Sequence, residues 1–285
     1  MTVVAFQGEH GAFSEEACHQ HYGPEVNTVS CHTIEDLFAS LDDDRATVGV
    51  VPVENSAAGS INKASDLLLH HDLRIQGEII LRVRHNLLKL PDNGDIIKEV
   101  RSHTQALAQC EQFLNNNGYE AVPWYNTAGS AKDLAESPEP NVAVIASALA
   151  AKTYGLEIVQ KNIEDESYNY TRFLIIGKGE TEQTQNAKTS IVFATPHNPD
   201  GLSSCLGELA DRNIKLIRLV SRPRRNYPWQ YVFYVDFEGH WREAACGAAI
   251  LGLVNRAAFV KMLGSYPAAI QPGEDRYTQK TMLQI

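Results

Sequence analysis

Short apolar runs alternate with helical segments between residues 3 and 176, and this alternation limits the fold more than any other feature of the chain. The predicted strands cover residues 3–6, 28–31, 48–53, 99–101, 120–124, 142–145 and 173–176. One predicted helix starts near residue 14, and others cover 33–41, 60–71, 102–115, 127–136 and 147–154. Strands that alternate with helices form a parallel or mixed α/β sheet, so we expect that class of fold.

The alternation is interrupted once and then replaced by a second pattern. Extended segments around 73–76 and 78–88 suggest two α/β lobes that are joined by crossing strands, with a cleft between the lobes. Residues 180–187 are polar and lack periodicity, which indicates a linker. Strand 188–194, helix 199–212, strands 214–220 and 230–237, helix 243–259 and strand 261–266 then follow the βαββαβ order of the ferredoxin-like motif. We therefore expect domains at 1–180 and 188–268, and a loose tail at 269–285.

The charge and cysteine content exclude some classes of protein. The 285 residues carry a net charge of −10, whereas nucleic-acid and membrane-surface binders usually present a basic face. No stretch reaches the ~20 apolar residues of a membrane span, and the N-terminus lacks a signal-peptide pattern. The five cysteines are dispersed without a Cys-x-x-Cys pair, so we expect reduced thiols and a cytoplasmic protein.

We expect neither a metal nor another cofactor. Among the ten histidines, the pairs His19 and His21, and His70 and His71, lack the spacing of a zinc site. The chain also has no P-loop, no Gly-x-Gly-x-x-Gly and no Gly-x-Ser-x-Gly, which leaves a nucleophile-elbow hydrolase unsupported.

Good N-capping residues follow several predicted strands: Ser14, the stretch Asn55–Ser60, Ser102 and Thr127. Ser102 and Gln105 match an S-x-x-Q capping box, and Gly129 would let a ligand approach the backbone. Ligands of open α/β sheets bind at the carboxyl ends of strands, where helix N-termini offer free N–H groups. A single cap only stabilises its helix by about 1 kcal/mol. The whole set, together with a nearby arginine, indicates a site for an anionic ligand.

Two further stretches place polar side chains next to apolar strands. Glu54, Asn55 and Ser56 follow a buried run in which Pro52 favours an edge or terminal strand position. In the stretch Asn-Tyr-Thr-Arg-Phe-Leu-Ile-Ile-Gly-Lys-Gly, residues 169–179, a hydroxyl and a cation precede the apolar run. The other candidates follow their strands. We therefore expect this strand to run antiparallel to its neighbours, or to return across the hinge between the lobes.

Six ordered motifs carry a resemblance to a known family: Gly8–Ser14, Val51–Ser56 with Gly59 and Ser60, Ser102–Leu107, Asn126–Ala131, Asn169–Phe173 and Leu263–Pro267. In these motifs the chain resembles the prephenate dehydratases, which make phenylpyruvate for phenylalanine synthesis, over nearly its whole length. The resemblance implies a two-lobed, periplasmic-binding-protein-like catalytic domain and a C-terminal ACT regulatory domain that binds phenylalanine at a subunit interface. It also implies a homodimer or homotetramer. Because no chorismate mutase segment precedes the motifs, we expect a monofunctional dehydratase.

The resemblance implies prephenate as the substrate, a dianion with two carboxylates and a ring hydroxyl, and Thr171 as the catalytic residue beside that hydroxyl. A threonine is a poor acid near neutral pH, so we expect it to donate a hydrogen bond, with Glu54 as the candidate proton relay. Arg172 would clamp one carboxylate through its planar fork. The other substrate-binding candidates are Asn55 and Ser56 for the ring, Ser102, Gln105 and Thr127 for the second carboxylate, and Phe173 as an apolar wall.

The effector motifs of the family fall on two stretches of the second domain. Gly-Ala-Leu-Val corresponds to Asp200, Gly201, Leu202 and Ser203, where only the leucine is in register. Glu-Ser-Arg-Pro corresponds to Val220 followed by Ser221, Arg222 and Pro223, so the glutamate is replaced. With Asn213, these residues are the candidates for binding phenylalanine, and the departures bear on its affinity and identity.

Two alternatives stay open at the level of sequence. An arogenate dehydratase would share the fold and chemistry but act on a substrate with an amino group in place of the keto group. A non-enzymatic small-molecule-binding regulatory protein would also have two α/β lobes. The missing signal peptide weakens a solute-binding protein, and the lack of a helix-turn-helix or basic patch weakens a transcription regulator.

Overall fold

A computed structural model describes residues 2–91, 94, 96–196, 199–223 and 231–270 of the chain. It divides into two compact units, of which the first comprises Met1–Asp72 and Leu81–Lys178. The second comprises Leu73–Ile80 and Gly179–Ile285. Strand β5, Arg74–Arg82, carries the chain from one unit into the other. Within the described residues, no helix has the length and apolar character needed to cross a membrane.

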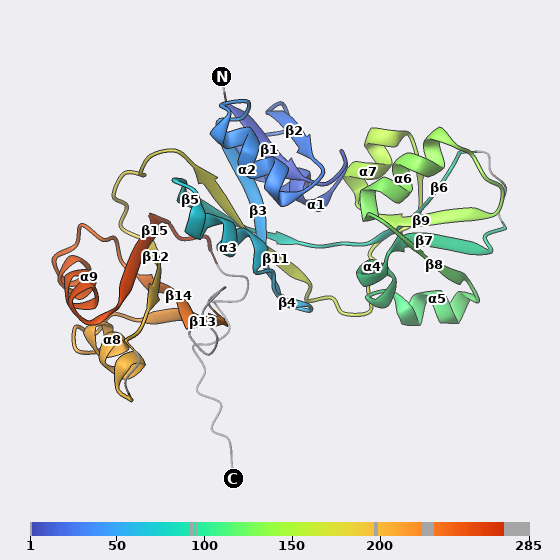
Figure 1. The fold of residues 1–285 in the computed structure, drawn as a ribbon. Coiled ribbons are helices and arrows are strands. Elements are labelled where there is room, and N and C mark those ends of the chain that lie inside the picture. Colours follow the sequence, from blue (N-terminus) through green and yellow to red (C-terminus); the bar gives the residue numbers. More distant parts are fainter. Residues whose placement is uncertain (1, 92–93, 95, 197–198, 224–230, 271–285) are drawn as a thin grey trace, which may run out of the picture. The chain divides into compact units, whose positions relative to one another are not determined.

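The first lobe of unit 1 is a mixed sheet in the order β2-β1-β3-β11, with the short β4 paired to β3 (Figure 1). Strands β1, β2 and β3 are parallel, whereas β11 runs antiparallel to β3, which confirms the prediction for this strand. Its strands are β1 Val3–Gln7, β2 Asn27–Cys31, β3 Val48–Asn55, β4 Gly59–Ser60 and β11 Tyr170–Gly177. Its helices are α1 Phe13–Tyr22, α2 Ile34–Asp42 and α3 Lys63–His70.

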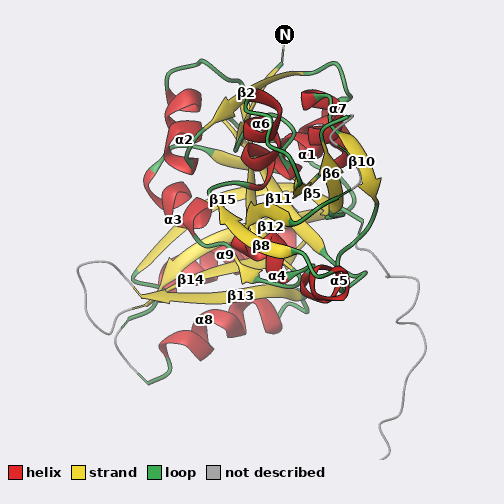
Figure 2. Cartoon of the chain, turned by 90° about the vertical axis from the view of Figure 1, so that its right-hand side faces the viewer, coloured by secondary structure: helices red, strands yellow, loops and turns green. Residues whose placement is uncertain are grey.

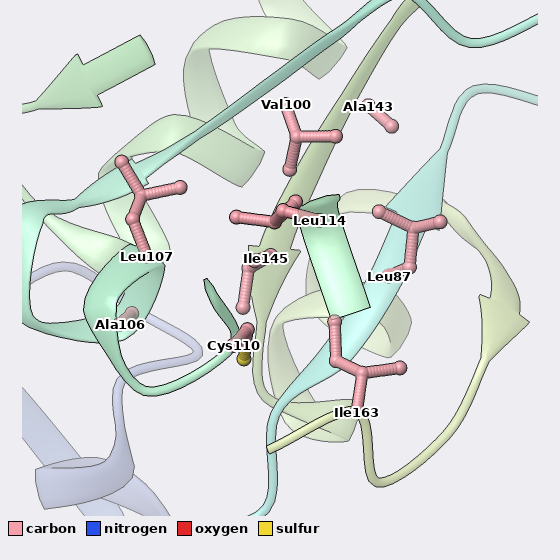
Figure 3. Packing of buried hydrophobic residues seen from close by; sticks show 9 residues of the cluster. All are labelled: Leu87, Val100, Ala106, Leu107, Cys110, Leu114, Ala143, Ile145 and Ile163. Carbon is pink, nitrogen blue, oxygen red and sulfur yellow. The ribbon is translucent and has the colours of Figure 1, made fainter. Parts of the chain in front are cut away.

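The second lobe has its own sheet, in the order β10-β6-β9-β7-β8. Its strands are β6 Asn86–Lys89, β7 Glu99–His103, β8 Glu120–Trp124, β9 Val142–Ala146 and β10 Glu157–Gln160. Its helices are α4 Thr104–Ala108, α5 Glu111–Asn117, α6 Thr127–Glu136 and α7 Ala148–Tyr154. Successive side chains of β9 enter two different cores, because a strand presents alternate residues to opposite faces. Ala143 and Ile145 pack with Leu107 and Cys110 on one face (Figure 3), and Val144 packs with residues of α6 and α7 on the other.

Two segments connect the lobes, and they lie side by side. The outgoing segment follows β5, and the returning segment precedes β11. The backbone N–H of Val83 donates to the carbonyl of Asn169 (2.8 Å), and that of Ile163 donates to the carbonyl of His85 (2.9 Å). The start and the end of the returning segment are thus tied to the outgoing one.

The lobes also touch through the loop between β1 and α1. Gly11 adopts φ +84°, and a Cβ there would lie 2.6 Å from Cα of Ala150 in α7. The hydroxyl of Ser147 donates to the carbonyl of Gly11 (2.6 Å), and that of Tyr154 donates to the carbonyl of His10 (2.8 Å). Close approach of the two backbones therefore explains why this position is a glycine.

The helix predicted near residue 14 begins at Phe13, but several predicted N-caps are wrong. Ser14 lies inside α1, whose N-cap is Ala12, and Ser60 lies in β4. Ser102 ends up in β7, where its hydroxyl donates to the carbonyl of Ile145 (2.7 Å) instead of capping a helix. The predicted cap at Ser102 failed because a buried hydroxyl takes a backbone carbonyl that the fold brings near it.

Thr127 is the first residue of α6, and Asn126 caps the helix by accepting hydrogen bonds from the N–H groups of residues 128 and 129. The edge position predicted from Pro52 is also wrong, because β3 lies between β1 and β11. The proline is accommodated because the pairing of β1 ends at Val50 and β11 changes register between Arg172 and Phe173.

Unit 2 contains a four-stranded antiparallel sheet in the order β13-β14-β12-β15, as the βαββαβ prediction requires. Its elements are β12 Ala187–Ala194, α8 Gly201–Ala210, β13 Leu216–Pro223, β14 Tyr231–Glu238, α9 Ala244–Arg256 and β15 Phe259–Pro267. Figure 2 distinguishes its helices and strands by colour, and α8 and α9 share one apolar core with β12 and β14. Two predictions, residue 230 of the third strand and the loose tail from residue 271, lie outside the described residues.

Candidate active site

Thr171 and Asn55 face each other on paired strands and form the centre of the candidate site. They are register partners on β11 and β3, and both are buried. Nδ2 of Asn55 donates to Oγ1 of Thr171 (2.9 Å) and to Oδ1 of Asn169 (2.9 Å). Both strands belong to one rigid sheet, so the geometry of this pair is set by the backbone ladder.

Backbone N–H groups fix the direction of these bonds. Oδ1 of Asn55 accepts from the backbone N–H groups of Ala57 (3.0 Å) and Ala58 (2.8 Å), so this side must be the carbonyl oxygen. Its Nδ2 must therefore be the donor, and Asn169 must present its oxygen. Nδ2 of Asn169 in turn donates to Oε1 of Gln109 (3.0 Å). The donor and the acceptor of each of these hydrogen bonds are thus assigned, from the turn at Ala57 and Ala58 to Gln109 in the second lobe.

His85 is the last member of this chain. Its Nε2 lies 2.8 Å from Oε1 of Gln109, which is an acceptor, so Nε2 carries the hydrogen. Burial lowers the pKa of His85, which favours the neutral ring. We call Asn55, Thr171, Asn169, Gln109 and His85 the amide chain.

The amide chain leaves Thr171 with one specific capability. Its oxygen accepts from Asn55, so its own O–H hydrogen is available to a further acceptor. A hydroxyl that already accepts a hydrogen bond becomes a somewhat better donor, because bonded groups polarise one another. The site can therefore donate a hydrogen bond to an oxygen that gains negative charge.

Arg172 follows Thr171 along β11 and supplies a positive charge near the start of that strand. It is the register partner of Glu54, and its Nη1 lies 3.9 Å from Oε2 of Glu54. The Arg172 side chain is 11% exposed and that of Glu54 is 42% exposed. The cation is thus held at the end of the sheet, while the carboxylate faces solvent.

Other predicted site residues have different surroundings. Ser56 joins the returning segment to β3, because its hydroxyl donates to the carbonyl of Tyr168 (3.0 Å) and accepts from the N–H of Tyr170 (2.9 Å). Ser102 has no exposed surface, and Phe173 is 2% exposed, so neither offers its side chain to a ligand in this structure.

Gln105 is exposed and Thr127 is half-buried, and both stand at helix starts. The space above Gly129 holds the ring of Tyr125, which a Cβ on Gly129 would meet at 2.5 Å. The expected approach of a ligand to that glycine is therefore taken by a side chain of the protein.

Sequence reasoning missed three members of the amide chain: His85, Gln109 and Asn169. Asn169 opens the stretch that was singled out for Thr171, and this was the available signal. Gln109 and His85 gave none, because a lone amide and a lone histidine next to apolar residues are usually only satisfied core groups.

The effector candidates of unit 2 fall into two groups. Arg222 and Ala194 both pair with Val232, so Ser221–Pro223 lie at the end of the sheet where β12 ends, a few residues before α8 begins. Asp200 is the N-cap residue of α8, which places Asp200–Ser203 at the same end. Asn213 precedes β13, whose first residue pairs with Phe237, so it lies at the opposite end of the sheet.

The described residues include no group of three or more His, Cys, Asp or Glu side chains that could hold a metal ion. All five cysteines are free and buried.

Fold and site together define a class: a two-lobed α/β protein with a buried threonine and an arginine at a strand start, followed by a ferredoxin-like unit. Comparison with known proteins identifies the family. The sequence model of prephenate dehydratase matches residues 4–181. The chain belongs to the prephenate dehydratase family, whose members are enzymes.

Two curated relatives illustrate the match. A bifunctional chorismate mutase/prephenate dehydratase of Neisseria gonorrhoeae is 40% identical over 272 residues, covering 94% of this chain and 75% of the relative. An arogenate dehydratase/prephenate dehydratase of Arabidopsis thaliana is 40% identical over 276 residues, covering 93% of this chain and 72% of the relative.

Solved structures agree with the family, and one carries a different activity. The prephenate dehydratase of Arthrobacter aurescens in complex with L-Phe has a TM-score of 0.85 and 28% identity, covering 95% of this chain and 94% of that one. A chain described as GqqA, a novel type of quorum-quenching acylase, has a TM-score of 0.87 and 32% identity, covering 94% of this chain and 98% of that one.

Proposed function

We propose that the chain is a carbon–oxygen lyase that converts prephenate into phenylpyruvate, carbon dioxide and water. The ring carboxylate leaves as carbon dioxide, and its bonding electrons move into the ring as the bond to the ring hydroxyl breaks. The ring becomes aromatic, which drives the reaction. What the protein must supply is help for the departing oxygen and control of the geometry.

The single observation that carries this proposal is the hydroxyl of Thr171. It accepts from Asn55 and keeps its hydrogen for another acceptor, and the next residue along β11 is the cation Arg172. A donor that is held in place before the reaction stabilises developing negative charge without reorganisation. Thr171 donates a hydrogen bond to the departing oxygen, and the hydroxide that leaves takes up one proton, from solvent or from Glu54, to become water.

Arg172 is the principal ligand for a carboxylate of the substrate. Its guanidinium can form two parallel bonds to one carboxylate, whereas the first N–H groups of α6 are already bonded to Asn126. Gln105 and Thr127 are secondary candidates for the second carboxylate. Phe173 and Ser102 support the site from within the core.

The test is turnover of prephenate by the purified full-length chain, followed through the absorbance of phenylpyruvate. Arogenate is measured in parallel, because relatives of both names are found. A kcat/KM for prephenate at least tenfold above that for arogenate supports the proposal. The reverse ratio makes the chain an arogenate dehydratase, and no turnover of either substrate refutes the enzyme function.

We also propose that phenylalanine inhibits the enzyme by binding to unit 2. The similar structure from Arthrobacter aurescens is described in complex with L-Phe, and the two effector stretches of this chain lie at one end of its ferredoxin-like sheet. Coupling between two sites typically amounts to about 1–3 kcal/mol, so we expect a shift of about 5–150-fold in apparent affinity. Dose–response curves with phenylalanine, and with leucine as the control, test this, and a flat phenylalanine curve excludes it.

We further propose that the enzyme is a cytoplasmic homodimer or homotetramer, with an ACT-type regulatory domain. The five free, buried cysteines support a reducing compartment. Light scattering on the purified protein measures the oligomeric state, and a monomer would contradict it.

The acylase described for one similar chain is the second candidate. Acyl transfer needs a nucleophile in contact with a base. His85, the histidine of the amide chain, bonds an amide oxygen rather than the hydroxyl of Thr171. The geometry therefore favours the dehydratase, and an amide-hydrolysis assay on the same preparation is the control.

A further inference from the structure

His85 is the one titratable member of the amide chain, and the proposed function gives it no role. It lies on the outgoing connection between the lobes and is 3% exposed. Its backbone N–H donates to Oε2 of Glu164 (3.0 Å), and its carbonyl accepts from Ile163 (2.9 Å). Its ring meets that of Phe13 edge-on, at 5.5 Å between centroids and 80° between planes. The position and the tilt of the imidazole are therefore both fixed.

The structure also fixes which nitrogen of His85 carries the hydrogen. Ala57 and Ala58 fix the amide orientation of Asn55, and the hydrogen bonds from Asn55 to Asn169 and from Asn169 to Gln109 then fix the next two amides. The Gln109 atom that faces His85 is therefore an oxygen, and Nε2 of His85 must be the donor. Nδ1 is then a bare acceptor, and among the described residues it has no hydrogen-bond partner. A protonated ring would bury an unpaired N–H at this atom, so the neutral form with hydrogen on Nε2 is the stable one.

Oε1 of Gln109 accepts two hydrogen bonds, and these two bonds fix the orientation of the Gln109 amide group. Oε1 accepts from both His85 and Asn169, so rotation of the amide would place donors against donors. The backbone of Gln109 is held as the C-cap of α4, and the next residue, Cys110, is fully buried in the core (Figure 3). The Nε2 group of Gln109 is thereby held as a donor on a partly exposed side chain.

We propose that His85 is a positioning residue of the dehydratase site: its Nε2–H locks the amide of Gln109, and through Asn169 it holds Asn55 against Thr171. The inference rests on the proposed function. The backbone N–H groups of Ala57 and Ala58 hold the amide orientation of Asn55 at one end of the amide chain. The Nε2–H of His85 holds the amide orientation of Gln109 at the other end. The histidine lies between the lobes, so it also ties the second lobe to the catalytic strand of the first.

The decisive experiment compares His85→Phe with His85→Gln. Phenylalanine keeps the planar ring and its contact with Phe13 but removes the donor. Glutamine places an N–H close to the position of Nε2. We expect kcat to fall about tenfold in His85→Phe, because misplaced catalytic groups cost rate even when the site stays assembled. KM should change less than threefold, and His85→Gln should recover most of kcat.

A double-mutant cycle shows whether His85 acts through Gln109. In a Gln109→Met background, His85→Phe should cause no further loss of kcat, because the amide that it orients is gone. His71→Phe is the matched control: this histidine also packs edge-on against a phenylalanine, Phe38, but bonds Asp42, whose carbonyl accepts from Lys178 just beyond the end of β11 opposite Thr171. We expect wild-type kcat for this variant, and thermal unfolding of every variant reports whether it folds.

The outcomes separate this proposal from the proposed function. Wild-type protein that turns over prephenate, with His85→Phe equally active or His85→Gln equally impaired, overturns the role of His85 alone. Additive losses in the Gln109→Met background do the same. Wild-type protein without dehydratase activity overturns both proposals. Nitrogen-15 spectra of the histidines test the geometry independently of activity, and hydrogen on Nδ1 of His85 would contradict the direction of the amide chain.

Discussion

Replacing Thr171 by valine tests the site most directly, because the two side chains have the same shape and differ by one hydroxyl. In the wild type this hydroxyl accepts from Asn55 at 2.9 Å, and we propose that it donates its own hydrogen to the substrate. The variant removes that donor without opening a cavity. Removal of one preorganised donor to a developing negative charge typically lowers kcat by about 10²–10³-fold. We expect a loss of this size, with KM changed little, because the proposed carboxylate ligand Arg172 is unchanged in this variant.

The effect on stability can be worked out separately. The variant deprives one N–H of Asn55 of its partner at a position where Thr171 is 7% exposed. A buried, unsatisfied donor costs about 1–3 kcal/mol. The carbonyl of Tyr170 lies 3.3 Å from the same nitrogen and can take over the bond, so we expect a cost near 1 kcal/mol. A loss of that size lowers the midpoint of thermal unfolding by about 2–4 °C, which leaves the enzyme folded at assay temperature.

The assay measures kcat and KM for prephenate at 25 °C, together with thermal unfolding, for wild type, Thr171→Val and Thr171→Ser. Serine keeps the hydroxyl but loses the methyl group that restricts χ1, so it should retain more activity than valine. The reasoning would be refuted by a Thr171→Val enzyme with kcat within tenfold of wild type. A serine variant as inactive as the valine variant would show that packing, rather than the hydroxyl, controls the rate.

Three further predictions concern the surroundings of the site. Arg172→Lys should raise KM about tenfold with a smaller change in kcat, because a point charge cannot replace a planar fork; an unchanged KM would reject the carboxylate clamp. Gly11→Ala should destabilise unit 1 by at least about 2 kcal/mol in urea unfolding, since its Cβ would lie 2.6 Å from Cα of Ala150 at a positive φ; a smaller loss would mean that the lobes separate easily. Burial raises the pKa of Glu15, but hydrogen bonds from the Gly11 N–H, His10 and Thr28 lower it more, so the net pKa lies below the ordinary value. The stability that Glu15 contributes is therefore present above its unfolded-state pKa and lost as the pH falls through the folded-state pKa; Glu15→Gln should flatten this acid-side loss, and an unaltered pH profile would contradict it.

The order of strands and helices was legible in the sequence because it depends on local periodicity. Buried runs such as 142–145 and 173–176 became β9 and β11, and the βαββαβ order of unit 2 followed from the same kind of pattern. Strand β10 had no such signal, because Glu157–Gln160 is mostly exposed and is defined by its pairing with β6. Helix boundaries were less accurate, since a hydroxyl at a strand end can bond a cap or a distant carbonyl with equal ease.

The sequence by itself determined the mixed α/β class, the family, and the position of Thr171 and Arg172 at the start of a strand. Only the tertiary structure decided how Thr171 is used. Its partner Asn55 lies 116 residues away in the chain, Asn55 and Asn169 are separated by 114 residues, and Gln109 lies 60 residues from Asn169. Periodicity reports which face of an element is buried, but the choice of hydrogen-bond partner for a buried amide depends on which elements meet there. Thr171, the proposed catalytic residue, was therefore visible in the sequence, whereas the amide chain around it exists only in the folded protein.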